Sequence, residues 1–310
     1  MSVTRAVWIA VIGLVLSANA QARVLLLASE DSTLYHEFRA GFEAVMEGSE
    51  GAPEIRYLAV EEYTPEAGAI SERLVIAAGV EAAKQLAALK TGDVRVLYTM
   101  LPLTSYEWLR DNDMLVKDHE VILVDQPPSR FINLIRVALP KINSLGFLYG
   151  EVSAEHTQQL TAAAVRHQFN LQLIALHDDR RLTHILKAAV RDNDAILVLP
   201  DPYLFNRRAI QALLLASLRG RKPLIAYSES YVQAGALLAL YSAPQQLGRQ
   251  SAERVLCYLS DCAEVADQQR YPRYFTVELN AAIARQLGLS VPPVDTIQRR
   301  LEALESEPTP

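Results

Sequence analysis

Polar and aromatic side chains follow two apolar runs in the centre of the chain, at the point where each run ends. The runs, residues 195–199 and 224–227, show no polar alternation, which is typical of strands buried on both faces of a parallel sheet. Ligands bind outside the carboxyl ends of such strands. A carboxylate for an ammonium group, a hydroxyl and aromatic rings suit a small organic ligand. The predicted ligand-binding residues here are Asp201, Tyr203, Ser228 and Tyr231.

Two further positions could contribute to the same kind of site. Ser29 follows the first apolar run of the chain, and Gly79 ends a later one, each just before a predicted helix. Backbone amides at a helix start can hold an anion. Helix capping by Ser32 and tight packing at Gly79 are the alternative interpretations, and a turn with the flanking prolines is the alternative for Asp201.

The chain contains no recognisable catalytic, metal or phosphate-binding motif. G-x-S-x-G, H-E-x-x-H, S-x-x-K and the glycine-rich nucleotide fingerprints are absent from the sequence, and its six histidines are scattered without metal-ligand spacing. We therefore expect no catalytic residue, no metal and no cofactor. A secreted enzyme on a two-lobed α/β scaffold stays open as the third hypothesis, because triad partners need not be close in sequence.

The elements that must position these residues alternate between strands and helices. Short apolar runs and amphipathic segments succeed one another up to residue 124, and the alternation restarts at residue 145. This pattern predicts an α/β fold with two Rossmann-like, doubly wound parallel-sheet lobes. The predicted strands are residues 24–28, 55–60, 74–78, 94–99, 121–124, 145–149, 171–176, 195–199 and 224–227.

Between the two series lies a Pro-Pro pair that fits neither a helix interior nor a central strand. Residues 125–130 are therefore a predicted crossover, and residues 231–240 and 271–279 are the other candidates. Several crossings form a hinge and place a cleft between the lobes, a favoured ligand site. Gln126 and Arg130 belong to the hinge or rim, and Arg130 is either a ligand anchor or part of the hinge.

These crossings divide the chain into predicted domains. Residues 23–125 plus about 236–272 form an N-terminal lobe, and residues 126–235 plus about 273–300 form a C-terminal lobe. The polar, proline-containing end, residues 301–310, is predicted to be disordered.

The first 22 residues predict export. A short basic start, an apolar run over residues 6–16 and small residues that fit A-x-A indicate a cleaved signal peptide, because the run is too short to span a bilayer. We expect a periplasmic protein without a membrane anchor in its mature chain. The net charge of −6 without a Lys/Arg cluster argues against nucleic acid as a partner. Cys257 and Cys262 are candidates for a structural disulfide in that oxidising compartment.

Several phrases of the chain resemble the substrate-binding proteins of bacterial ABC transporters, in the subgroup that includes aromatic amino-acid binders. The resembling phrases lie at residues 75–83, 194–201, 223–228, 231–236, 247–252 and 275–292. The resemblance implies a type I periplasmic-binding fold whose lobes close on a small ligand. By position it implies ligand contacts from Ser29, Gly79, Met100, Asp201, Ser228 and Tyr231. Residues 126–130 depart from the family's pattern, so amino-acid specificity is not carried over.

The first functional hypothesis is a periplasmic solute-binding protein that delivers a small organic ligand to a membrane permease. The second keeps the fold, with the closed form read by a sensor or serving an outer-membrane uptake system.

Overall fold

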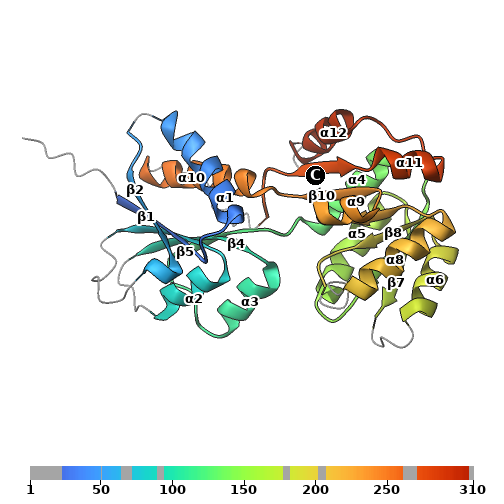
Figure 1. The fold of residues 1–310 in the computed structure, drawn as a ribbon, viewed down its shortest axis with the longest axis horizontal. Coiled ribbons are helices and arrows are strands. Elements are labelled where there is room, and N and C mark those ends of the chain that lie inside the picture. The colour runs from blue at the N-terminus through green and yellow to red at the C-terminus, as the bar shows by residue number, and fades with distance from the viewer. Residues whose placement is uncertain are drawn as a thin grey trace, which may run out of the picture.

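A computed structural model describes residues 23–49, 51–63, 72–88, 94–176, 182–201, 207–260 and 271–306. The chain folds into two α/β lobes that lie side by side, each with its own sheet between layers of helices (Figure 1). The predicted fold class is confirmed. Within the described ranges, no helix is both long and apolar enough to cross a membrane.

The first lobe is built on a parallel sheet of five strands in the order β2-β1-β3-β4-β5. Its central strand, β3, is buried along its whole length, as the unbroken apolar run predicts. A 3-10 turn, η1 (Val60–Glu62), follows β2. The strands are β1 (Arg23–Ala28), β2 (Glu54–Ala59), β3 (Leu74–Ala78), β4 (Arg95–Leu101) and β5 (His119–Leu123).

Two helices cover each face of this sheet. α1 (Thr33–Glu47) and α10 (Pro244–Leu259) pack on one face, and α2 (Val80–Ala88) and α3 (Leu103–Asp111) pack on the other (Figure 1). α10 comes from far along the chain and meets α1 through glycine. A Cβ on Gly248 would lie 1.9 Å from the carbonyl oxygen of Phe38, so only glycine permits this approach.

The second lobe carries a six-stranded sheet in the order β11-β10-β9-β8-β6-β7, in which only β11 runs antiparallel to its neighbour among the described pairs. β8 and β9, the two apolar runs that organise the sequence, lie side by side in it and are buried throughout. The strands are β6 (Ser144–Tyr149), β7 (Asn170–Ala175), β8 (Ala195–Val198), β9 (Leu224–Ala226), β10 (Leu238–Tyr241) and β11 (Thr276–Leu279).

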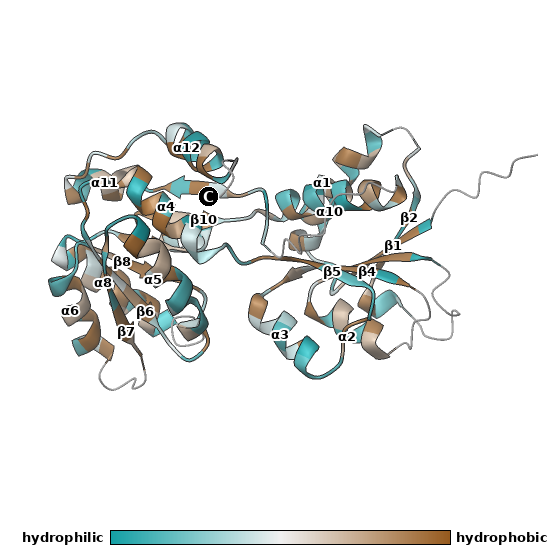
Figure 2. Cartoon of the chain, turned by 180° about the vertical axis from the view of Figure 1, so that it is seen from behind, coloured by the Kyte–Doolittle hydropathy of each residue, from teal (hydrophilic) through white to brown (hydrophobic). Residues whose placement is uncertain are grey.

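The helices of the second lobe form two apolar layers against its sheet. One layer contains α4 (Pro128–Ala138), α5 (Thr157–Arg166), α11 (Ala281–Leu287) and α12 (Val294–Ser306), with the 3-10 turn η3 (Ser153–His156) leading into α5. The other contains α6 (Leu182–Asp192), α8 (Arg207–Gly220) and α9 (Glu229–Ala234). The strands are mostly apolar and the outer helices carry the polar residues, so each lobe has its own core (Figure 2).

The chain passes between the lobes three times, and two details differ from the sequence-based expectation. The return was predicted to begin near residue 236, but residues 238–241 of that apolar run form β10 in the second sheet, and the crossing follows it at residues 242–243. The tail was predicted to be disordered from residue 301. Instead α12 continues to Ser306, because Ile297 and Leu301 lie one helical turn apart and are buried in the second core.

Candidate functional site

A cavity of about 640 Å³ lies between the two lobes, and residues of both lobes and of the hinge line it. The first lobe contributes the first turn of α1 and the junction of β4 with α3, including Leu34 and Ser105. The second lobe contributes the loops after β6, β8 and β9, including Val152 and Ser228. The sheet edges facing the cavity are therefore the carboxyl ends of parallel strands, where the topology predicts a ligand. The volume is within the range of small-molecule sites.

Three carboxyl groups from different elements gather at this cavity. Asp125, just after β5, and Glu155, in η3, line it. Glu107 of α3 is hydrogen-bonded to Glu155, and this contact joins the two lobes. A hydrogen bond between two carboxyl groups requires that one of them carries a proton.

The pKa values of these groups follow from their surroundings. Burial raises the pKa of Asp125 to about 6, although its Oδ2 accepts a 2.7 Å hydrogen bond from the Leu103 backbone amide at the start of α3. Burial, followed by the charge of Glu107, raises the pKa of Glu155 to about 7. With these pKa values Glu155, and to a smaller extent Asp125, is partly protonated near neutral pH.

His156 is the one basic side chain among the described residues that line the cavity. It is 5% exposed, and burial lowers its pKa to about 4, so its imidazole is neutral at neutral pH. Its Nε2 lies 3.6 Å from Oε1 of Glu155. The cavity wall is thus acidic, without a compensating cation of its own.

Aliphatic and aromatic side chains form the rest of the wall. Phe131 and the rings of Tyr227 and Tyr241 line the cavity, together with aliphatic residues that include Leu199 and Leu247. The described lining therefore offers a ligand apolar surface and aromatic faces, beside polar side chains that include Ser105, Gln126 and Ser242.

Met100 lines the cavity with a strained backbone. Its φ is +56°, a left-handed conformation that is uncommon for residues other than glycine, asparagine and aspartate. The register between β4 and β5 shifts at this position, which marks a bulge between Thr99 and Leu101. Bulges next to functional sites re-aim side chains, and strain of this kind is concentrated at ligand sites.

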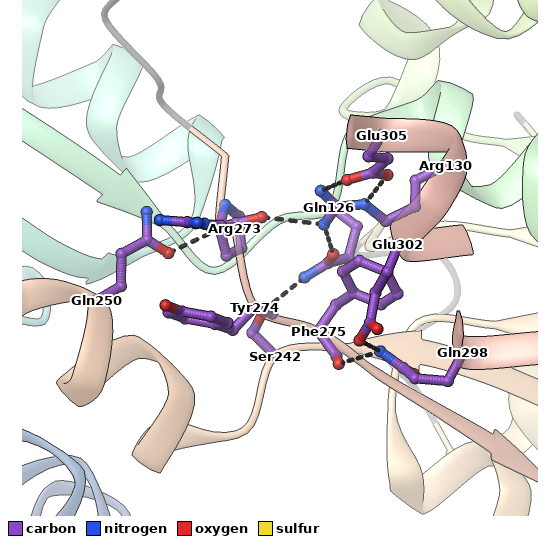
Figure 3. Close-up of polar contacts among 11 residues, drawn as sticks. Gln126, Arg130, Ser242, Gln250, Arg273, Tyr274, Phe275, Gln298, Glu302 and Glu305 are labelled. Atoms are coloured by element: carbon purple, nitrogen blue, oxygen red, sulfur yellow. Dashed lines mark hydrogen bonds and ion pairs between the residues drawn. The ribbon is translucent and has the colours of Figure 1, made fainter. Parts of the chain in front are cut away.

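A buried polar network ties the three crossing segments together beside the cavity (Figure 3). Gln126 of the first crossing donates a 2.8 Å hydrogen bond to Ser242 of the second, whose hydroxyl donates to the Tyr274 carbonyl of the third at 2.5 Å. Arg130 donates to Oε1 of Gln126 at 2.5 Å and to the Pro272 carbonyl at 3.0 Å. The hinge is therefore a connected structure rather than three independent linkers.

Arg130 is the centre of this network. Its side chain is 4% exposed, and its guanidinium forms a two-pronged ion pair with Glu305 of α12 and lies 4.3 Å from the ring centroid of Phe275 (Figure 3). The sequence left open whether Arg130 anchors a ligand or belongs to the hinge. The structure places it in the hinge, with its donors directed at protein acceptors.

A family model described as "ABC transporter substrate binding protein" matches residues 123–293, more than half of the chain. The chain belongs to the ABC transporter substrate-binding protein family. The resemblance predicted from the sequence is confirmed. The match begins at the end of β5 and covers the whole hinge and most of the second lobe. Among curated proteins, no sequence matches this chain.

Solved structures share the two-lobed fold of this family member. The ligand-free, open structure of a substrate-binding protein with adhesive properties from Clostridium difficile is 15% identical, with a TM-score of 0.68 over 90% of this chain and 98% of that one. An ABC domain in complex with L-Trp from Streptococcus pneumonia is 17% identical, with a TM-score of 0.54 over 88% and 96%. A conserved domain protein from Vibrio cholerae is also 17% identical, with a TM-score of 0.53 over 90% and 98%.

The residues predicted as ligand contacts divide into two groups in this family member. Met100 and Ser228 line the cavity, and so does Gln126 of the predicted hinge. Tyr231 is instead buried beside the cavity wall, with its ring centroid 5.1 Å from that of Tyr227 and the two hydroxyls hydrogen-bonded. Tyr231 therefore supports Tyr227, which lines the cavity itself.

Asp201 has a structural position rather than one on the cavity wall. It is fully buried, and its Oδ2 accepts hydrogen bonds from the Gly150 amide at 3.0 Å, the Ser153 amide at 2.9 Å and the Ser153 hydroxyl at 2.7 Å. These bonds fix the loop that leads into η3. Asp201 therefore positions Glu155 at the cavity through the backbone, and the expectation that it receives a ligand ammonium group directly is wrong for this arrangement.

Ser29 and Gly79 lie together at the edge of the first sheet, off the cavity wall. The Ser29 hydroxyl donates to the Ala78 carbonyl at 3.1 Å and accepts from the Ala82 amide at 3.0 Å, so it is used at the start of α2. Gly79 has a φ of +92°, and a Cβ there would lie 2.0 Å from the hydroxyl of Tyr35. Tight packing, the alternative considered for Gly79, is what the structure shows.

Two residues named in the sequence-based predictions, Tyr203 and Cys262, lie outside the described residues. Cys257, the other candidate for a structural disulfide, is disulfide-bonded. In the described part of the chain, no cluster of three or more His, Cys, Asp or Glu side chains could hold a metal ion.

Sequence reasoning missed the acidic residues of the cavity. Asp125 follows β5 directly, so its position at a strand end was a usable signal. The sequence carries no such signal for Glu155 and Glu107, because their contact depends on how the two lobes face each other.

Proposed function

We propose that this protein is a periplasmic solute-binding protein that captures a small organic ligand between its lobes and delivers it to an ABC-type permease. The observation that carries the proposal is the cavity of about 640 Å³, whose wall is shared by both lobes and the hinge. A ligand that touches both lobes stabilises their closed arrangement and shifts the population toward it. The permease then distinguishes loaded from empty protein by lobe geometry, without bond chemistry.

Three further observations support this proposal. The family is one of substrate-binding proteins of ABC transporters, and one solved structure of the same fold is a complex with L-Trp. The sequence of residues 1–22 has the features of an export signal, in agreement with a periplasmic location. The connected hinge gives the lobes a defined axis about which to close.

The test is a thermal-shift screen of the chain from residue 23 onward against amino acids, amines, purines, sugars and short peptides. A ligand that binds only the folded protein raises the melting temperature with concentration. Ser105→Trp, which fills the cavity from α3, is expected to abolish the shift. Gln159→Trp, on the exposed surface of α5, is the matched control and should keep it. A shift that survives in Ser105→Trp would place the ligand elsewhere.

A further inference from the structure

The wall of the cavity has a one-sided charge. Asp125 and Glu155 present carboxyl groups to it from the hinge and the second lobe, and Glu107 adds a third through its hydrogen bond to Glu155. Within the described residues no lysine or arginine lines the cavity, and His156 is buried and neutral at neutral pH. A ligand therefore meets negative potential from both lobes.

Arg130 of the hinge and Arg110 of α3 form no ion pair with Asp125 or Glu155 among the described residues. Arg130 is paired with Glu305 inside the hinge. Arg110 lies 2.9 Å from Asp111 and 3.9 Å from Glu107, and almost half of its side chain is exposed. Asp125 has no ion-pair partner among the described residues, and its Oδ2 accepts the Leu103 amide. The uncompensated negative charge therefore lies inside the cavity, where a cationic ligand would neutralise it.

The rest of the wall defines the body of such a ligand. Tyr227, Tyr241 and Phe131 offer aromatic faces, and the aliphatic side chains around them offer no hydrogen bonds. A cation over an aromatic face is attracted by the ring quadrupole, most strongly where water is excluded. Negative groups beside aromatic faces thus select a positively charged group attached to an apolar body.

We propose that the ligand of the cavity is an organic amine, a cation with an apolar, ring-sized body and no carboxylate. The inference rests on the proposed function and specifies its substrate class. The ammonium group of the amine takes the place of the proton held between Glu155 and Glu107, and Asp125 supplies the second negative charge. An amino acid would bring a carboxylate against the same acidic wall, and an organic acid would bring only the unfavourable charge.

The proton shared by the carboxyl groups of Glu155 and Glu107, which belong to different lobes, couples ligand binding to pH. The groups that face Glu155 are Glu107 of α3, Asp125 after β5 and His156 of η3, and Arg110 lies 3.9 Å from Glu107. An incoming ammonium group displaces the shared proton, so amine binding releases protons and strengthens as the pH rises from about 6 to about 8, where an alkylammonium group is still charged.

The experiment is calorimetric titration of the chain from residue 23 onward with three indoles that share a ring and differ in charge: tryptamine, L-tryptophan and indole-3-propionate. 2-Phenylethylamine, L-phenylalanine and 3-phenylpropionate repeat the series with a smaller ring. At about pH 8 we expect the amine of at least one series to bind at least about tenfold more tightly than its amino acid and about a hundredfold more tightly than its acid. Proton release, measured in two buffers of different ionisation enthalpy, should accompany amine binding.

Two variants test the residues. Asp125→Asn keeps an acceptor for the Leu103 amide, and Glu155→Gln keeps the shape of the side chain; each should weaken amine binding about tenfold or more, while the melting temperature confirms folding. Glu151→Gln, an exposed carboxylate on the same loop, is the control and should bind like the wild type.

The outcomes separate the two proposals. The proposed ligand class is overturned if the amino acid or the acid binds more tightly than the amine. It is also overturned if the amine binds Asp125→Asn and Glu155→Gln as tightly as the wild type. Failure of the amines while a sugar, purine or peptide binds in the cavity also overturns it but leaves solute capture standing. Failure of the amines together with every solute class of the thermal-shift screen contradicts both.

Discussion

The ion pair between Arg130 and Glu305 makes a measurable prediction about how the C-terminal helix holds the hinge. The Arg130 side chain is 4% exposed, whereas the Glu305 side chain is 29% exposed. Breaking a fully buried pair by removing one partner costs about 3–5 kcal/mol, since the other charge stays buried. Because water reaches Glu305, we expect Glu305→Gln to lower the free energy of unfolding by a smaller amount, about 2–3 kcal/mol.

Arg130→Met should cost more. It removes the pair and also leaves the Pro272 carbonyl and Gln126 Oε1 without their donor, at about 1 kcal/mol each, so we expect about 4 kcal/mol in total. In the double variant the loss should fall short of the sum of the two single losses by about 2 kcal/mol, because both substitutions remove the same interaction.

Scanning calorimetry measures the effect directly. For a chain of this size each kcal/mol shifts the melting temperature by roughly 2–4 °C, so Glu305→Gln should melt roughly 5–10 °C below the wild type. Asp295→Asn, which neutralises an exposed carboxylate in the first turn of the same helix, is the matched control and should melt close to the wild type. A Glu305→Gln variant that melts with the wild type and the control would refute the hinge role assigned to α12.

Three further predictions address the first lobe, the loop of the cavity and its titration. Gly248→Ala should destabilise the protein by about 2–3 kcal/mol, measured by urea unfolding, because the new methyl group would collide with the Phe38 carbonyl and force α1 and α10 apart; normal stability would mean that α10 packs differently. Asp201→Ala should cost about 3 kcal/mol, since it leaves buried amides without an acceptor, and the same loss should appear with and without a bound solute; a loss confined to the solute-bound state would restore a direct ligand role. The raised pKa of Glu155, about 7 against an ordinary 4.5, stabilises the folded protein at acidic pH, and that contribution is lost as the pH rises through about 7. The melting temperature of the wild type relative to Glu155→Gln should therefore fall between about pH 5 and pH 8, and a pH-independent difference would argue against the shared proton.

Much of the fold follows from the sequence because buried parallel strands have a strong local signature. The runs that became β3, β8 and β9 are short, continuous and apolar, and they end at polar residues or glycine. The same signature was present at residues 236–241, where the interpretation as a crossover was wrong and residues 238–241 form β10. In α12, the helical spacing of Val294, Ile297 and Leu301 was available, but the polar composition around it favoured disorder.

The site was less predictable, for physical reasons. Topology places Ser228 just after the carboxyl end of β9, where it lines the cavity. Met100, which also lines the cavity, was predicted only through the family resemblance. Topology alone cannot say whether a carboxylate at a strand end points to solvent or back to its own chain, and Asp201 does the latter. The acidic wall depends on Glu107 and Glu155 meeting across the lobes, and no local pattern encodes a contact between residues on separate domains.

The measurement that tests the central claim most directly is the radius of gyration of the protein in solution, by small-angle X-ray scattering, with and without a solute that raises its melting temperature. Capture between the lobes predicts a smaller radius when the solute is bound, and no change in Ser105→Trp, whose cavity is filled. A solute that binds with the same affinity in both proteins and leaves the radius unchanged would contradict capture by lobe closure.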